Sequence, residues 1–438
     1  MGLSCLQAAQ DWLQWRGPRW DGSSEVQGLP ERLDASAIRW RVPLPGAGAS
    51  TPIICGTRVF VTAADEEAEK LVALCFDRES GKELWAKELG PTYTPAGRGK
   101  PTAIDNRSNY ATPSAACDGE RVFFFFGNGD LAATTLAGEE LWKRNLQQDY
   151  GDFAFQWTFS ATPTLHGGKL YLAILQRDQP TGRGAKKPEQ PIPSFVLCID
   201  PQTGKTDWKV ERKAPAQMES LESYATIVPR VRKDGRTELI VLGGDVITGH
   251  DPADGKELWR WGTWNEGHRE AWWRIVPTPV VGGDVVLVCA PKRAPVYAVK
   301  LEGEGQLPAE ALVWKSEGRP NSVTSDVPTP LFHEGRFYVA SDLANALSRV
   351  DPATGKVEWT VELDREFLWR ASPIAAGGRI WMQNHHGTLY GFAPADGKEV
   401  ARLALGREDD DGICASVAAA HGRLFVRTNR ELVCLGKE

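Results

Sequence analysis

Short apolar runs alternate with polar turns that contain glycine along almost the whole chain, and together they form one pattern. Each copy begins with Thr or Ser, usually followed by Pro, and passes through a turn into a β-branched or aromatic run. Short β-rich runs at this spacing predict the four-stranded blades of a β-propeller. The pattern therefore predicts an all-β fold, an eight-bladed propeller, with copies that begin at Thr51, Thr112, Thr162, Thr226, Thr278, Thr329, Ser372 and Ser416.

A second part of the pattern is a turn that begins with Asp and ends with Gly-Lys, as in residues 200–205. The Asp side chain can bond a backbone N–H, and the Gly takes a positive φ, so the turn suits a hairpin between the third and fourth strands. A Trp follows most copies. We interpret these residues as packing units that dock one blade on the next; they are Trp85, Trp142, Trp208, Trp259, Trp314 and Trp359.

The eighth copy stops after its third strand, and the missing outer strand has a match near the other end of the chain. Trp40, within Arg39-Trp40-Arg41-Val42, stands where a docking Trp is expected. The sequence thus predicts that an N-terminal strand completes the last blade, which leaves no open sheet edge. The expected domains are an N-terminal arm, residues 1–37, and a single propeller, residues 38–438.

Charge and hydropathy narrow the functional classes. The chain carries 51 Lys and Arg against 57 Asp and Glu, a net charge of −6, with both signs scattered. That balance argues against binding to a nucleic-acid backbone. No apolar run approaches the roughly 18 residues of a membrane helix, so we expect no transmembrane segment.

The repeat, with its Asp-x-x-x-Gly-Lys-x-x-Trp turns, resembles the PQQ-type propeller family, which includes quinoprotein alcohol dehydrogenases and the outer-membrane assembly lipoprotein BamB. The opening Gln14-Trp15-Arg16-Gly17-Pro18 resembles the N-terminal signature of a bacterial group of such propellers. The resemblance implies export. Residues 3–9 are apolar and end in small side chains, like the tail of a trimmed signal peptide, so the expected location is periplasmic or secreted.

Quinoproteins of this family carry a vicinal disulfide against the cofactor, and calcium ligands in the axial site. The sequence has eight Cys, but no adjacent pair and no Cys-x-x-Cys. Cys75, Cys198 and Cys434 share one strand position that other blades fill with small residues, so we interpret them as packing residues. His385 and His386 are adjacent in a loop without a third ligand. We therefore expect no PQQ, no other cofactor and no metal site.

Aromatic and charged residues gather in the loops that join one blade to the next. Each loop returns toward the axis just before its Thr or Ser, so its last residues should approach one axial opening. Exposed Trp residues that converge in loops suggest binding. The predicted ligand-binding residues are Arg107, Tyr110, Trp157, Glu222, Tyr224, Trp272, Trp273, Arg274, Asp326, Trp369, Arg370 and Asp409.

Flat aromatic faces beside Arg and carboxylates suit sugar rings, peptides or planar anions. The first hypothesis is a monomeric binding propeller that holds a small polar ligand or a protein partner. The alternative is a carbohydrate-active enzyme in which Glu222, Asp326 or Asp409 performs acid–base work, and a third is a PQQ-dependent dehydrogenase. The same aromatics are also compatible with a plug that only fills the axial channel.

Overall fold

A closed ring of hydrogen bonds around the axis explains why each repeat begins with Thr or Ser. The backbone N–H at this position donates to the hydroxyl at the same position in the next blade, for example from Thr51 to Ser114 Oγ at 2.8 Å. The eighth bond returns from the Ser416 N–H to Thr51 Oγ1 at 3.3 Å. The inner strands are thus fixed to one another by residues that the repeat supplies.

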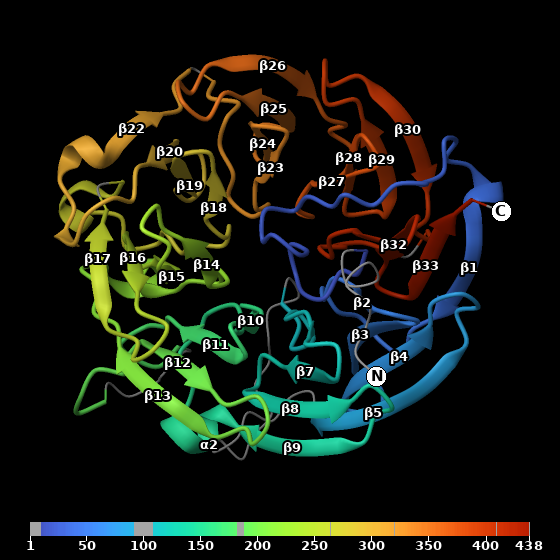
Figure 1. Cartoon of the computed structure of the whole chain (residues 1–438), viewed down its shortest axis with the longest axis horizontal. Helices are drawn as coiled ribbons and strands as arrows, with labels where there is room; N and C mark the ends of the chain where they lie inside the picture. Colours follow the sequence, from blue (N-terminus) through green and yellow to red (C-terminus); the bar gives the residue numbers. More distant parts are fainter. Residues whose placement is uncertain are drawn as a thin grey trace.

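The computed structural model describes residues 10–91, 108–181, 188–262, 264–318, 320–408 and 410–437. Within these ranges the strands form eight sheets arranged around one axis (Figure 1). Seven sheets have four strands, and the fourth gains a short fifth strand, β21 (Gly305–Gln306), which pairs in parallel with its outer edge. The predicted eight-bladed propeller is confirmed.

The first four blades are β2 (Ile53–Cys55), β3 (Arg58–Asp65), β4 (Lys70–Asp77) and β5 (Glu83–Pro91); β6 (Ala116–Cys117), β7 (Arg121–Phe125), β8 (Asp130–Thr135) and β9 (Glu140–Asn145); β10 (Thr164–His166), β11 (Lys169–Ile174), β12 (Phe195–Ile199) and β13 (Thr206–Glu211); and β14 (Val228–Val231), β15 (Thr237–Gly243), β16 (Val246–His250) and β17 (Glu257–Trp261). The next three are β18 (Val280–Gly282), β19 (Val285–Cys289), β20 (Val296–Val299) and β22 (Leu312–Lys315); β23 (Leu331–His333), β24 (Arg336–Ser341), β25 (Ala346–Val350) and β26 (Val357–Glu362); and β27 (Ile374–Ala376), β28 (Arg379–Gln383), β29 (Thr388–Phe392) and β30 (Glu399–Ala404).

The eighth blade consists of β31 (Ala418–Ala420), β32 (Arg423–Arg427), β33 (Glu431–Gly436) and the N-terminal β1 (Ile38–Pro43). Short helical turns are η1 (Ala35–Ala37), α2 (Leu146–Tyr150), η2 (Met218–Leu221), η3 (Glu266–His268) and η4 (Ala309–Ala311). No helix within the described ranges is both long and apolar enough to cross a bilayer.

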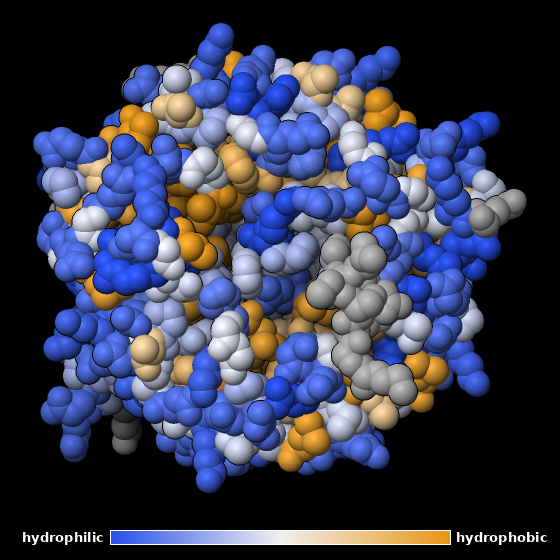
Figure 2. Space-filling model, in the orientation of Figure 1, coloured by the Kyte–Doolittle hydropathy of each residue, from blue (hydrophilic) through white to orange (hydrophobic). Residues whose placement is uncertain are grey.

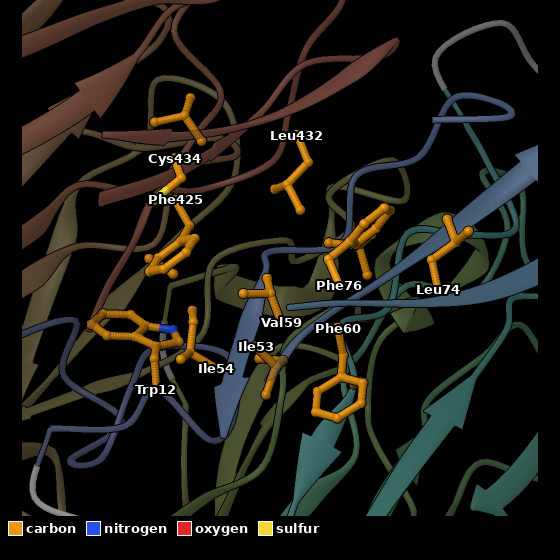
Figure 3. Packing of buried hydrophobic residues seen from close by; sticks show 14 of the residues in the cluster. Trp12, Ile53, Ile54, Val59, Phe60, Leu74, Phe76, Phe425, Leu432 and Cys434 are labelled. Atoms are coloured by element: carbon orange, nitrogen blue, oxygen red, sulfur yellow. The ribbon is translucent and has the colours of Figure 1, made fainter. Parts of the chain in front are cut away.

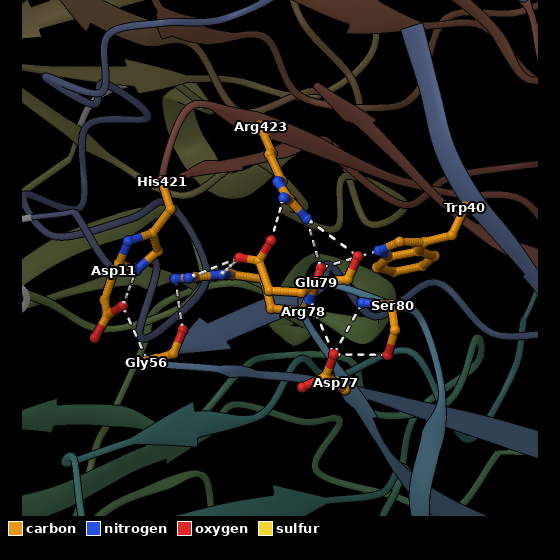
Figure 4. Close-up of polar contacts among 9 residues, drawn as sticks. All are labelled: Asp11, Trp40, Gly56, Asp77, Arg78, Glu79, Ser80, His421 and Arg423. Atoms are coloured by element: carbon orange, nitrogen blue, oxygen red, sulfur yellow. Dashed lines mark hydrogen bonds and ion pairs between the residues drawn. The ribbon is translucent and has the colours of Figure 1, made fainter. Parts of the chain in front are cut away.

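The N-terminal strand closes the ring as predicted. β1 runs antiparallel to β33, with Trp40 opposite Cys434. Figure 4 shows the junction with the first blade: Trp40 Nε1 donates to the Arg78 carbonyl at 2.9 Å, and Arg423 donates to the same carbonyl and to the Glu79 carboxylate. The closure therefore joins both ends of the chain to the first blade.

The recurring Trp residues dock blades, as predicted. Each indole N–H donates to a carbonyl in the Gly-containing turn of the following blade at 2.8–3.2 Å; the six are Trp40, Trp85, Trp142, Trp208, Trp314 and Trp359. The turn Gly is required because a Cβ on Gly81 would lie 2.6 Å from the Trp40 ring. Trp259 differs: the fifth blade replaces this turn with the insertion that carries β21, and Trp259 donates instead to Glu238 of its own blade at 2.7 Å.

Apolar side chains fill the space between neighbouring blades. Figure 3 shows this packing where the eighth blade meets the first: Phe425 lies beside Ile54 and Val59, and Trp12 of the arm packs against Ile54. All four side chains are fully buried. Burial of this kind supplies the main favourable contribution to folding.

The arm is a cover over one end of the axis. Its dark-blue trace crosses the centre of the ring in Figure 1. It bonds to the inner strands or first hairpins of six blades, through contacts of Trp12 with Ile54, Leu13 with Cys117, Gln14 with Leu165, Asp21 with Phe332, Gly22 with Ala375, and Asp11 with His421. We call this face, which carries the hairpins between first and second strands, the arm face.

Arg16, in the Gln-Trp-Arg-Gly-Pro segment, holds the centre of the arm. Its guanidinium is buried and donates to the carbonyls of Pro373 at 2.8 Å and Pro330 at 2.5 Å, in two different blades. Burial lowers its pKa to about 10. In the view of Figure 2, hydrophilic residues predominate along the rim, and hydrophobic residues are visible beside the central hollow, mainly to its left.

Candidate functional site

The candidate residues lie on the face opposite to the arm. Strands alternate in direction within each blade, so the blade-to-blade loops and the turns between second and third strands share one side. We call this side the loop face, and its end of the axis the axial mouth. Three groups of polar and charged side chains lie along it, between the third blade and the eighth.

The first group centres on Glu222, whose side chain is 0% exposed. Its carboxylate accepts hydrogen bonds from Arg177 Nε, from the Tyr224 hydroxyl, and from the Gln156 N–H at 3.0 Å. Burial raises the pKa of Glu222 even though Arg177 and Tyr224 oppose the shift. Burial and the adjacent Glu222 also raise the pKa of Tyr224. The Glu222 carboxylate is therefore fully bonded by neighbouring groups of the protein.

The second group links the third blade to the sixth. Trp157 Nε1 donates to Glu219 at 2.9 Å, and Arg274 Nε lies 3.9 Å from the same carboxylate oxygen. Arg274 then makes a two-pronged pair with Asp326, both bonds at 2.9 Å, and the Lys292 N–H adds a third bond at 2.7 Å. Burial opposes ionisation of Asp326, but Arg274 outweighs it and lowers the pKa of the carboxyl.

The third group surrounds Arg370. The Asp326 N–H donates to Asp342 at 3.1 Å, and burial raises the pKa of the Asp342 carboxyl. Burial, followed by the charge of Arg370, lowers the pKa of His385 to about 4. His385 Nε2 lies 3.6 Å from the Cys414 thiol, whose pKa burial raises to about 11. An unprotonated imidazole beside a protonated thiol is not an activated nucleophile.

The loop face also exposes one large aromatic ring. Trp272 is 52% exposed, and the Arg177 guanidinium lies 5.7 Å from its ring centroid. Trp273 is half-buried and packs on the cluster that contains Trp264. A fixed aromatic surface beside paired charges can stack a flat polar group.

Comparison with known proteins places the chain in a family. The family described as outer membrane protein assembly factor BamB matches residues 33–182, 194–309 and 304–400. The chain belongs to this family. No curated protein is similar to it in sequence.

Solved structures share the fold at low identity. A europium-containing methanol dehydrogenase is 11% identical with a TM-score of 0.67, and 98% of each chain is covered. BamB from Moraxella catarrhalis is 12% identical with a TM-score of 0.60, over 92% of this chain and 97% of that one. Quinohemoprotein alcohol dehydrogenase from Comamonas testosteroni is 13% identical with a TM-score of 0.65, over 98% and 81%. These likenesses describe the fold alone.

The family raises the question of a quinone cofactor, and the described residues do not fit the expected site. Seven cysteines within the described ranges are free: Cys55, Cys75, Cys117, Cys198, Cys289, Cys414 and Cys434. The same ranges contain no group of three or more His, Cys, Asp or Glu placed to hold a metal ion. We therefore derive no chemistry through PQQ, and the expected absence of a cofactor stays a prediction.

Two predicted ligand-binding residues have buried side chains. Ser114, not Thr112, takes the ring position in the second blade, so the sequence alignment there was wrong by two residues, and Tyr110 falls four residues before the ring and is buried against the first two blades. Trp369 is 0% exposed and packs against Tyr390 between blades, at 4.8 Å between ring centroids. Neither side chain offers a surface to a ligand in this structure.

Arg107 and Asp409 lie outside the described residues. Asp342 and Arg427, which sequence reasoning missed, stand near the axial mouth. Arg427 had a signal: it ends the apolar run of β32, where a charged residue is unexpected. Asp342 opens the turn between β24 and β25, and no pattern in the sequence marked it.

Proposed function

We propose that this protein is an exported binding propeller that holds a polar ligand or a protein partner on its loop face. The family description, an outer-membrane assembly factor, supports a location outside the cytoplasm and a protein partner. The loop face adds its own support, because it displays aromatic and charged groups while the arm face is occupied by the chain itself.

The observation that carries the proposal is the exposed Trp272 ring beside Arg177. Large aromatic rings left in water are unfavourable, and they are typical of recognition surfaces. Arg177 is anchored by Glu222, so the stacked pair is held in place before any ligand arrives. Preorganisation of this kind lowers the entropic cost of binding.

The enzyme alternative gains no such support. Glu222 is sealed by Arg177 and Tyr224, and the oxygens of Asp326 are engaged by Arg274 and Lys292. A general acid or base must reach its substrate directly or through one water. A carboxylate free to do so is absent from these two groups.

The test is a binding comparison on the full chain. Maltopentaose, a neutral ten-residue peptide and an acidic ten-residue peptide are titrated by calorimetry into the wild type, Trp272→Ala and the control Leu84→Ala. Leu84 is 45% exposed but lies on outer strand β5. We expect Trp272→Ala to weaken binding of at least one probe about tenfold, and Leu84→Ala to leave it unchanged. Binding that is equal in all three proteins, or no binding by any probe, contradicts the proposal.

A further inference from the structure

Arg427 is a fully buried arginine without a carboxylate among the described residues. It is 0% exposed, and its Nη1 donates to the Ser50 hydroxyl and to the Thr62 carbonyl. Its Nε and Nη2 are buried without a hydrogen-bond partner. Burial lowers its pKa to about 9, so the group remains a cation at neutral pH. A buried and unpaired cation is costly to maintain.

The place of Arg427 relative to the axis follows from Gly48. A Cβ on Gly48 would lie 2.4 Å from Arg427 Nη2, so the glycine makes room for the guanidinium. Gly48 lies three residues before Thr51, the ring position of the first blade. The charge of Arg427 is therefore placed at the inner edge between the eighth blade and the first, next to the axial mouth.

Arg370 lies on the same face, in the loop between the sixth and seventh blades. It is half-buried, its Nε is buried without a partner, and it forms no hydrogen bond or ion pair with the described part of the chain. The nearby Asp326 already binds Arg274 and the Lys292 N–H. Asp342 receives the Asp326 N–H and is held by burial toward its neutral form, with a raised pKa.

We propose that Arg370, supported by the charge of Arg427, binds an oxyanion group, either a carboxylate or a phosphate, at the axial mouth. This inference rests on the proposed function, since it names the charge of a ligand on the loop face. A guanidinium presents two parallel N–H donors that match both oxyanions. The anion enters from the loop face because the arm covers the other end of the axis.

The arginines between the sixth blade and the first differ in their ion pairing from those between the third and the fifth. Between the third and fifth blades, Arg177 and Arg274 each pair with a carboxylate, which neutralises their charge. Arg370 and Arg427 leave two positive charges for an incoming group. Because Arg427 is buried, the dielectric constant around it is low, and its attraction for an anion is screened less than at the surface.

The test uses inorganic phosphate and acetate as probes on the full chain, with sodium chloride at matched ionic strength as the reference. Binding is measured by calorimetry and by the shift in Tm, since a ligand that binds the folded state raises it. We expect at least one probe to stabilise the wild type beyond chloride. Arg370→Met should weaken that binding about tenfold or more, and Arg427→Met should weaken it less.

The control is Arg365→Met, which removes the same charge from the same blade-to-blade loop. Arg365 is 70% exposed and pairs with Glu362, so binding should persist. A phosphate-only or acetate-only response assigns the ligand chemistry. The proposal is overturned if neither probe exceeds chloride, or if Arg370→Met binds as well as the wild type. The two proposals can fail separately. If binding of a sugar or peptide probe depends on Trp272 but neither phosphate nor acetate binds, this inference is wrong and the proposed function still holds.

Discussion

The two ends of the propeller axis are built differently, although each contains a buried arginine. At the arm face, Arg16 donates to the carbonyls of two inner strands, and the backbone of the arm pairs with the blades. At the loop face, Arg427 keeps two unpartnered nitrogens, and Arg370 forms no ion pair with the described residues. Arg16 Nε is also buried without a hydrogen-bond partner, but the Arg16 guanidinium still bonds two blades, whereas that of Arg370 bonds none of the described residues.

This difference links the arm face to the stability of the fold and the loop face to ligand recognition. Polar groups that are satisfied internally contribute to a unique fold. A local departure from that rule, retained at a cost to stability, is expected at functional sites. Changes at the arm face should therefore lower the free energy of unfolding, and changes at the loop face should mainly affect binding.

The largest expected effect is that of deleting residues 1–45. The deletion removes the cover with Arg16, exposes the edge of β33, and takes away the docking Trp40. We expect a loss of about 5 kcal/mol or more, a large fraction of the stability of an ordinary domain. Urea unfolding followed by circular dichroism measures it. A midpoint close to that of the wild type would show that the arm is dispensable.

Arg16→Met tests the centre of the cover alone. The substitution leaves the Pro330 and Pro373 carbonyls without their donor, and we expect a cost of about 3 kcal/mol. Arg19→Met is the matched control: Arg19 is half-exposed and its ion pair with Glu25 lies at the surface, so its cost should stay below about 0.5 kcal/mol. Equal costs for the two variants would remove the distinction between the two ends of the axis.

Much of the fold could be predicted from the sequence because the same blade pattern occurs eight times. Trp40 and the turn glycines predicted closure and docking, since a small residue and a ring must meet at each junction. Trp259 broke the pattern because an insertion in the next blade removed its turn. The second blade was misaligned because Thr112-Pro113 imitates the motif, while Ser114 holds the bond.

The candidate site was less predictable, for a physical reason. The sequence placed Glu222, Tyr224, Arg274 and Asp326 on the loop face because they stand near the ends of the blade-to-blade loops. Their pairing was not, because it depends on side chains from different blades. Trp369 shows the same limit: its loop faces the predicted side, but its ring turns into the space between blades.

The pH dependence of stability sharpens the comparison at the loop face. The pKa of His385 is lowered to about 4 from an ordinary value near 6.5, mainly by burial. Between these values the unfolded chain binds more protons than the folded protein, so stability falls as pH drops from about 6.5 to about 4, by up to roughly 3 kcal/mol for this group.

His385→Gln should remove that part of the slope. His250 has the same sign, since burial lowers its pKa to about 4, so the slope of the variant should shrink rather than vanish. Unfolding curves in urea at several pH values between 4 and 7 give the measurement. An unchanged slope would mean that His385 is protonated in the folded protein, which would add a third cation beside Arg370.

The smallest effects are expected in the hydroxyl ring, which lies between the two ends of the axis. Thr278 accepts the Thr226 N–H at 2.9 Å, and Thr51 accepts the Ser416 N–H at 3.3 Å where the ring closes. Thr→Val keeps the volume and removes the acceptor, which leaves a buried N–H unpaired. We expect Thr278→Val to cost about 1 kcal/mol and Thr51→Val less, because the closing bond is longer and β1 and Arg423 also hold that junction. Chemical denaturation of both variants under one condition measures the difference. If Thr51→Val is the more damaging, the ring itself, and not the N-terminal strand, is what holds the eighth blade to the first.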